Sequence, residues 1–468
     1  MSTAQSENIV SQSVDGVYEG PLLPVIIQMS VPIVIGLLIQ VFYNIADTVW
    51  ISMIDPSNPA IIAGVGLVFP LGMILFAIGN GLQVAMGSVL SRAIGAREDA
   101  ATQELFAVGL LQALLIGALV LALALIFGEQ LLALLGASGE LETYALEFFI
   151  YSLPGVVPIV LIGTLMGMLQ GQGRMTAMMQ AVLIGSVVNI VLDPVLIFVF
   201  DMGVKGAALA TVIAQFIVMA KLLLTLAMEP GELRLKLIPV KGGFSLSKRL
   251  STIGSAQMWI HIIIAGSVLI YNRFVIDVDP MAMAAFTLVG RLDFLIMIPM
   301  FGISTALLTI AGQNWGRKNY DRAFAVLRIA TILAFVCVLV LALLHILIAP
   351  LIYPLFSQVP EVVNYAVLQV RIMELSLPFI AISLCVAEFH QAIGKPAPAL
   401  MLTIIRHFIL SVPVVYVLIY MQQMGIMGVY FGAMSGTFFA AAVAYYMRFR
   451  LVSAYSNETS IPAMGDAS

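Results

Sequence analysis

Charged residues are scarce in this chain. Asp, Glu, Lys and Arg together make up 10% of its 468 residues, whereas they make up about 25% of a typical soluble domain. Hydrophobic residues reach 61%, and the mean hydropathy is +1.08. These proportions exclude an ordinary soluble domain and indicate a chain that lies mostly inside a lipid bilayer. We expect no nucleic-acid partner.

Cysteine is scarcer still. The two that are present, Cys337 and Cys385, both lie in apolar stretches, so they provide neither a disulfide framework nor the spacing of a metal site. The apolar stretches are also continuous rather than alternating with polar residues, which excludes a membrane β-barrel. The remaining fold class is an all-α polytopic membrane protein.

Basic residues are absent from the first 23 positions. A secretory signal peptide begins with a positively charged region, so we expect residues 1–23 to be a polar segment and the first apolar run to remain as a membrane helix. At the other end, residues 451–468 are short and polar, and we expect them to be disordered.

Twelve apolar runs are long enough, at about 20 residues, to cross a bilayer. They form two sets of six, separated by one long polar connection at 229–250, which predicts an N-terminal lobe at 24–228 and a C-terminal lobe at 251–450. The runs lie near 24–54, 61–90, 104–127, 144–170, 176–200 and 206–228, then near 251–276, 282–312, 323–349, 361–391, 397–421 and 427–447.

The two sets share a sequence pattern. Gly81 and Gly95 recur 221 residues later as Gly302 and Gly316. Gln170, Gly173 and Arg174 recur at the same offset as Gln391, Gly394 and Lys395, and Gly203 and Gly206 recur one residue further out as Gly425 and Gly428. We therefore predict two homologous six-helix bundles. Because six is even, both insert the same way, and their pseudo-two-fold axis lies along the membrane normal.

The distribution of positive charge predicts the orientation. Most of the 21 Lys and Arg residues lie in the even-numbered loops or just after the last helix, whereas the loops near 55–60, 128–143, 350–360 and 422–426 have none. Loops rich in Lys and Arg remain in the cytoplasm. We expect both termini to be cytoplasmic in a bacterial inner membrane.

Two aspartates stand out because they lie inside apolar runs. A carboxylate at that depth costs roughly 2.5 kcal/mol or more. Asp47 shares one helix face with Gln40 and Asn44, at i, i+4 and i+7, and Asp193 shares a face with Asn189 at i and i+4. If both faces point into the first bundle, they form a cluster of carboxylate and amide oxygens.

The second half does not repeat these polar groups. At an offset of 221, Asp47 and Asp193 correspond to Val268 and Val414, and Asn44 and Asn189 correspond to Ala265 and Leu410. The first half therefore has a specialised site, to which Thr211 contributes a hydroxyl. Oxygen ligands suit Na⁺, and two coupled carboxylates can share a proton. The alternative is that these groups only join neighbouring helices.

Other residues are candidates for the transport path. Pro32, in the same helix as Asp47, permits a kink and is a candidate hinge. In the second half Arg291 and Asp293 can pair or line a cavity, while Glu388 and His390 fit side chains that reach the membrane interface from a helix end. The remaining candidate is Tyr151.

Three motifs carry a family resemblance. Tyr-Asn-x-x-Asp at 43–47, Gln-Gly-x-Gly at 170–173 and Asn-x-x-x-Asp-Pro at 189–194, in this order on two sets of six helices, resemble those of the multidrug and toxic compound extrusion (MATE) transporters, in particular the DinF-like branch. The resemblance covers about residues 20–450. It implies no enzymatic activity and no cofactor. It implies export of organic cations or amphiphilic drugs in exchange for H⁺ or Na⁺, by alternating access of two lobes, and we expect a monomer.

The resemblance also assigns roles to residues. It places Asp47, Asn189, Asp193 and Thr211 in the cation site, which would hold Na⁺ or a proton. Gln40 and Asn44 line the cavity and Pro32 bends the first helix. Two rivals stay open. One is a lipid-linked precursor flippase, which should line its cavity with several Arg or Lys, and the other is an intramembrane enzyme, for which the sequence has no nucleophile, metal set or diphosphate motif.

Overall fold

The structure is a computed structural model that describes residues 17–228, 234–235 and 243–459. Twelve of its helical segments are long and apolar enough to cross a membrane, which confirms the predicted fold class. The first half contains α2 (Leu22–Ser52), α3 (Pro59–Gly95), α4 (Asp99–Leu134), α5 (Glu140–Ser152), η1 (Leu153–Gly155), α6 (Val156–Gly171), α7 (Met175–Pro194), η2 (Val195–Val199) and α8 (Val204–Ala227). The second contains α9 (Gly243–Val278), α10 (Pro280–Gly316), α11 (Tyr320–Phe356), α12 (Pro360–Met373), η4 (Glu374–Ser376), α13 (Leu377–Ala392), α14 (Ala397–Ile404), η5 (Ile405–Ser411), α15 (Val412–Tyr416), η6 (Val417–Met421) and α16 (Ile426–Thr459).

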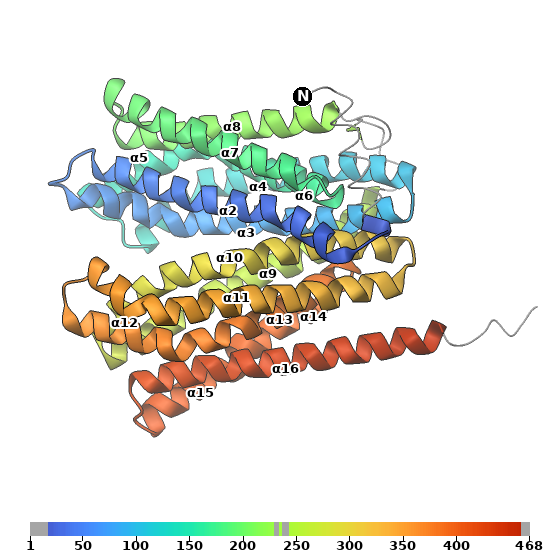
Figure 1. Cartoon of the computed structure of the whole chain (residues 1–468). Coiled ribbons are helices and arrows are strands. Elements are labelled where there is room, and N and C mark those ends of the chain that lie inside the picture. Colours follow the sequence, from blue (N-terminus) through green and yellow to red (C-terminus); the bar gives the residue numbers. More distant parts are fainter. Residues whose placement is uncertain (1–16, 229–233, 236–242, 460–468) are drawn as a thin grey trace, which may run out of the picture. The chain divides into compact units, whose positions relative to one another are not determined.

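The chain divides into two compact units. The N-terminal unit is Val31–Met258, and the C-terminal unit is Met1–Ser30 with Trp259–Ser468. Within each unit the long helices run side by side along a common direction (Figure 1). Helix α9 begins at Gly243, inside the segment expected to be a polar loop, and α16 continues past Arg450 to Thr459. Residues 1–16 and 460–468 of the two predicted terminal segments, and most of the predicted 229–250 loop, lie outside the described residues.

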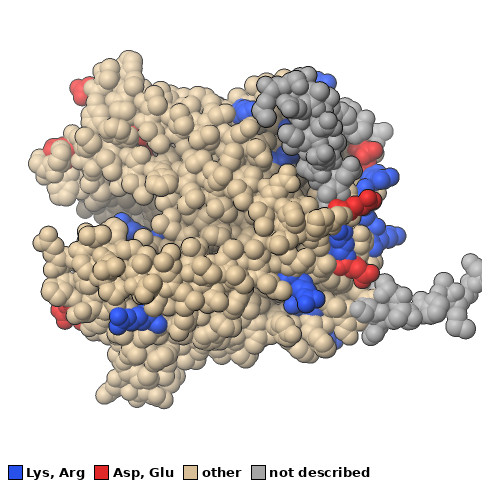
Figure 2. All heavy atoms as spheres, in the orientation of Figure 1, with Lys and Arg blue, Asp and Glu red and all other residues tan. Residues whose placement is uncertain are grey.

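The long sides of the helices are apolar. On the face drawn in Figure 2, charged side chains gather near the ends of the helices, and the surface between them carries few charges. Large apolar side chains such as Leu347 and Leu355 of α11 are exposed. An apolar surface of this extent fits contact with lipid rather than with water.

The backbone repeats at the offset found in the sequence. The helix pair α5–α6 is interrupted by the 3₁₀ turn η1, and α12–α13 is interrupted by η4, whose first residue lies 221 positions after that of η1. Left-handed backbone recurs at Arg97 and Lys318 and at Gly173 and Gly394, again 221 residues apart. These turns are therefore a property of the repeated framework.

One extra residue shifts the register within the second half. After η5 the offset is 222, since the π-helix η2 corresponds to η6, and Asp201 and Gln423 share a positive φ. A turn of π-helix, with its i→i+5 hydrogen bonds, accommodates one residue more than a turn of α-helix. The part of α7 that corresponds to η5 is an ordinary α-helix, so the extra residue of the second half lies in η5. The structural counterparts of Asp193 and Asn189 are therefore Val415 and Ser411, which corrects the expected Val414 and Leu410.

The two units pack corresponding helices differently. In the N-terminal unit α3 and α6 meet backbone to backbone, because a Cβ atom on Gly163 would collide with the backbone of Gly79. The counterparts of these glycines in α10 and α13 are Met300 and Leu384. Side chains rather than backbones therefore set the separation of the second pair.

Candidate functional site

Asp193 lies at the end of α7, inside the N-terminal unit. Its side chain is fully buried, and its Oδ1 atom has no hydrogen-bond partner among the described residues. Pro194 follows it and leads into the π-helix η2. Because proline lacks an N–H, the carbonyl of Ile190 loses its usual donor one turn later. Unpaired oxygens at this depth are costly unless a cation or proton reaches them.

Asn189 joins Asp193 to α8. With its amide nitrogen toward the carboxylate, Asn189 donates to Asp193 Oδ2 at 2.9 Å, and its oxygen accepts from the Thr211 N–H at 3.3 Å and from Thr211 Oγ1 at 3.2 Å. The opposite amide orientation would place two oxygen atoms face to face, so hydrogen bonding favours this one. Asn189 thereby fixes the positions of Asp193 and Thr211, as the predicted cluster requires.

Helix α2 brings Asp47 to the same place. Asp47 is half-buried and lies close enough to Asp193 for their charges to interact. One turn earlier on α2, the Tyr43 hydroxyl lies near Thr211 and the two carboxylates. The motif Tyr-Asn-x-x-Asp contains Tyr43, but we did not predict a role for this residue, because a tyrosine in an apolar run fits packing equally well.

Helix α2 approaches α7 before Asp47 and η2 after it. A Cβ atom on Gly36 would lie 3.8 Å from the Cα atom of Met179. Near the other end of α2, the rings of Trp50 and Phe198 meet edge to face at 6.3 Å. Beyond Asp47, Ile51 joins an apolar layer that closes this end of the cluster, with Ile61, Ile197, Val204 and Ala207. Apolar contacts thus lie on either side of Asp47 along α2.

The structure does not bring every predicted residue to this cluster. Gln40 and Asn44 are exposed on α2, whereas Asp47 is half-buried. Pro32 lies inside α2, next to the start of the N-terminal unit. Tyr151 is also exposed. The i, i+4, i+7 face of α2 therefore points only partly into the unit.

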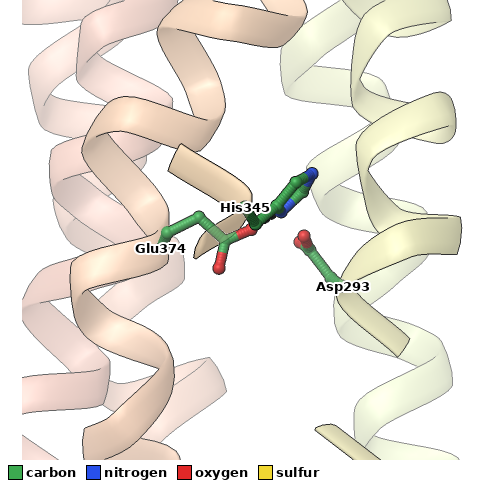
Figure 3. A group of neighbouring side chains, drawn as sticks. All are labelled: Asp293, His345 and Glu374. Atoms are coloured by element: carbon green, nitrogen blue, oxygen red, sulfur yellow. Dashed lines mark hydrogen bonds and ion pairs between the residues drawn. The ribbon is translucent and has the colours of Figure 1, made fainter. Parts of the chain in front are cut away.

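A second polar cluster lies in the C-terminal unit (Figure 3). Asp293 of α10, His345 of α11 and Glu374 of η4 have ligand atoms within 4.8 Å of one another. His345 Nδ1 lies 2.6 Å from Glu374 Oε1, and Tyr353 Oη lies 2.9 Å from His345 Nε2. Asp293 was a candidate from the sequence, whereas His345, Tyr353 and Glu374 were missed. His345 and Tyr353 are single polar residues in apolar runs, and no sequence spacing links Glu374 to Asp293 or His345.

The other second-half candidates lie apart from this cluster. Arg291 is exposed. Glu388 and His390 of α13 are buried rather than reaching outward, and His390 Nδ1 lies 2.8 Å from the carbonyl of Val386. Their burial does not fit side chains that reach the membrane interface from a helix end.

Comparison with known proteins decides the family. The MatE family model matches residues 32–195 and 259–417, which is most of the chain. The chain belongs to the MatE family. This MATE transporter is accordingly a multi-pass membrane protein, and its family is not enzymatic.

Several known proteins resemble this MATE transporter over nearly their whole length. The structure of the MATE transporter ClbM in complex with Rb⁺ is 47% identical, covers 92% of this chain and 95% of that chain, and has a TM-score of 0.85. A crystal structure of a MATE protein in the bent conformation is 26% identical, with coverages of 96% and 99% and a TM-score of 0.90. The multidrug export protein MepA of Staphylococcus haemolyticus is 24% identical over 92% of this chain and 95% of that protein.

Proposed function

We propose that this MATE transporter is a multidrug efflux antiporter of the DinF-like branch. It exports organic cations or amphiphilic drugs and takes up H⁺ or Na⁺ through the cluster of Asp47, Asn189, Asp193 and Thr211. The observation that carries the proposal is Asp193, a fully buried carboxylate with an unpartnered oxygen beside a second carboxylate. Burial of two such groups is tolerated when a cation or proton balances their charge.

The chemistry of the cluster supports a monovalent ion. Its ligand atoms are carboxylate, amide and hydroxyl oxygens, which suit Na⁺, and the same carboxylates can instead bind a proton. The 47% identical relative is described in complex with Rb⁺, which supports binding of an alkali cation. Drug export is supported by the name of MepA, a multidrug export protein.

Alternating access would link the two events. When a cation or proton binds Asp47 and Asp193, the negative charge of the cluster decreases, and α2 can then repack or bend at Pro32. A related MATE protein is described in a bent conformation, which supports such a change. With both termini in the cytoplasm, as the Lys and Arg distribution predicts, drug leaves the cell as the ion enters.

The proposal is tested by Asp47→Asn. The substitution keeps the size of the side chain and removes its charge, so we expect drug efflux from proteoliposomes to fall to the level of empty vesicles. Asp201→Asn is a matched control, since Asp201 is exposed and its positive φ of 53° suits Asn equally well. Near-normal efflux by the folded Asp47→Asn protein would disprove the role of the cluster.

The coupling ion is identified by imposing a pH gradient and a Na⁺ gradient in separate experiments. Efflux driven by either gradient in the native protein, and lost in Asp47→Asn, supports the antiporter. The same vesicles can be tested for transbilayer movement of a labelled lipid-linked precursor. Lipid movement without ion-driven efflux would instead identify a flippase.

A further inference from the structure

The cluster of Asp293, His345 and Glu374 belongs to the C-terminal unit, and its chemistry differs from that of the cluster of Asp47, Asn189, Asp193 and Thr211 in the N-terminal unit. Each residue comes from a different element of the C-terminal unit: α10, α11 and η4. Figure 3 shows the imidazole and the two carboxylates turned toward one another. The side chains of His345 and Glu374 are 5% and 1% exposed, whereas Asp293 is half-buried and contributes a buried Oδ1 atom.

Two oxygen atoms of this group have no partner. Neither Asp293 Oδ1 nor Glu374 Oε2 has a hydrogen-bond donor among the described residues. The ion pairs within the described residues bring no Lys or Arg to the cluster. His345 is the basic partner that these ion pairs give the two carboxylates, and even a protonated imidazole leaves one negative charge to be balanced.

The kind of ligand atom indicates the ion. Na⁺ and Mg²⁺ prefer oxygen ligands alone, whereas an imidazole nitrogen combined with carboxylates suits a divalent first-row transition metal. Two carboxylates also neutralise a divalent ion. The three donors, within 4.8 Å of one another, could converge on one ion with small side-chain movements and leave a coordination position open.

Tyr353 supplies the outer contact that such sites use. A metal-binding histidine commonly places its second ring nitrogen against a hydrogen-bond partner, which fixes the tautomer and the ring orientation. Tyr353 Oη lies 2.9 Å from His345 Nε2, and Tyr353 is fully buried. The ring is thus held with Nδ1 toward the two carboxylates.

We propose that Asp293, His345 and Glu374 bind one divalent transition-metal ion of the class of Mn²⁺, Co²⁺ and Zn²⁺. Such an ion ties α10 and α11 to η4, the break between α12 and α13. It would therefore hold the C-terminal unit together at a point where the repeated framework interrupts a membrane helix.

The test uses the full chain, purified in detergent and stripped of metal with a chelator. We expect titration with Co²⁺ or Zn²⁺ to show one bound ion per chain, with a visible Co²⁺ spectrum of mixed nitrogen and oxygen ligands and a rise in the unfolding temperature. His345→Asn and Glu374→Gln should each weaken binding about 100-fold or more, and Tyr353→Phe about 10- to 100-fold.

Matched controls lie in the same unit. Glu388→Gln and His390→Asn change a buried carboxyl and a buried imidazole on α13 without touching the cluster, so metal binding should persist in both. Asp47→Asn should also retain it, which separates this site from the proposed antiport site. The proposal is overturned if the native protein binds no ion, or if the His345 and Glu374 variants bind as well as the native chain. In either case, the unfolding temperature can be measured as a function of pH. A pH dependence that is lost in Glu374→Gln would show that the cluster binds a proton instead of a metal ion.

Discussion

The two halves of the chain share a framework but differ in where they carry polar groups. Equivalent breaks occur at η1 and η4 and at η2 and η6. Yet Asp193 corresponds to Val415, and Glu374 corresponds to Leu153 at the first break. Asp293 and His345 likewise correspond to Gly72 and Ala124. The repeated backbone does not depend on these groups, so each cluster is a separate addition to it.

The chemistry of the two clusters differs as well. The N-terminal cluster offers oxygen atoms only, and Asn189 and Thr211 position one of its carboxylates. The C-terminal cluster adds an imidazole nitrogen held by Tyr353. Oxygen ligands alone bind a monovalent ion weakly, which suits an ion that must be released in every transport cycle. An imidazole nitrogen with two carboxylates binds a divalent ion more tightly. If both proposals hold, one framework carries a different ion chemistry in each half.

The largest expected effect concerns packing. Gly163→Val adds side-chain atoms where even a Cβ would meet the backbone of Gly79, which we expect to cost about 3 kcal/mol or more and to prevent recovery of folded protein. Gly290→Ala is the control, since nothing lies within 4 Å of the added atom. Size-exclusion chromatography in detergent measures both. If Gly163→Val behaves like Gly290→Ala, the two halves do not differ in how α3–α6 and α10–α13 pack.

Moving the buried carboxylate tests whether its position matters. Asp193 and Val415 occupy equivalent positions and are fully buried. Four residues earlier, one turn back along the helix, Asp193 has Asn189, whereas Val415 has Ser411. In the double variant Asp193→Val, Val415→Asp, we expect ion-driven efflux at the level of empty vesicles, because the relocated carboxylate lacks Asp47 and the amide donor. Asp193→Asn should fail equally. Efflux by the double variant above that of Asp193→Asn would show that the halves are interchangeable.

A substitution at Pro32 in the first helix, α2, should have a smaller effect: it should stabilise the protein and slow transport. Only one of the two equivalent helices, α2 and α9, has a proline here, since Pro32 corresponds to Ile253. Pro32→Ala restores a backbone N–H and removes a helix-breaking residue, so the unfolding temperature should rise. Transport should slow by roughly 10-fold, which corresponds to about 1.4 kcal/mol on its barrier. Faster or unchanged transport would exclude a hinge at Pro32.

The sequence was informative where a signal repeats. Twelve apolar runs predicted the twelve spans, and Asp47 with Asp193 and Asn189 was recognisable because helical spacing pairs the polar groups. His345 has no such partner in its own helix, Glu374 follows Arg371 by three residues, and only folding places His345 and Glu374 beside Asp293. The sequence showed that Gly425 and Gly428 recur one residue further out, but we still applied the offset of 221 to Asp193 and Asn189, and locating the extra residue in η5 required the backbone. The exposure of Gln40 and Asn44 depends on how α2 packs against its neighbours. Their i, i+4, i+7 spacing with Asp47 predicts a shared helix face but not how far that face turns into the unit.

The smallest effect lies outside the membrane spans, at equivalent helix caps. Asn58 caps α3 by accepting from the Ala60 N–H at 3.0 Å, and its counterpart Asp279 caps α10 by accepting from the Met281 N–H at 2.8 Å. The hydrogen bond from Tyr365, at 2.7 Å, and that from Met281 hold the pKa of Asp279 below its usual value. A carboxyl with a lowered pKa stabilises the fold fully above its unfolded pKa of about 3.9, and this stability is lost as the pH falls through the lower folded value.

Hydrogen exchange can compare the two caps. Between pH 7 and pH 3 we expect protection at the start of α10 to decline once the pH falls below about 4. The amide oxygen that caps α3 does not titrate, so the change there should be smaller. Asp279→Asn retains an acceptor oxygen and removes the titrating group, so it should reduce protection slightly at pH 7 and abolish the decline. A decline that persists in Asp279→Asn would show that another group near α10 titrates, and the difference between the halves would then lie elsewhere than in their caps.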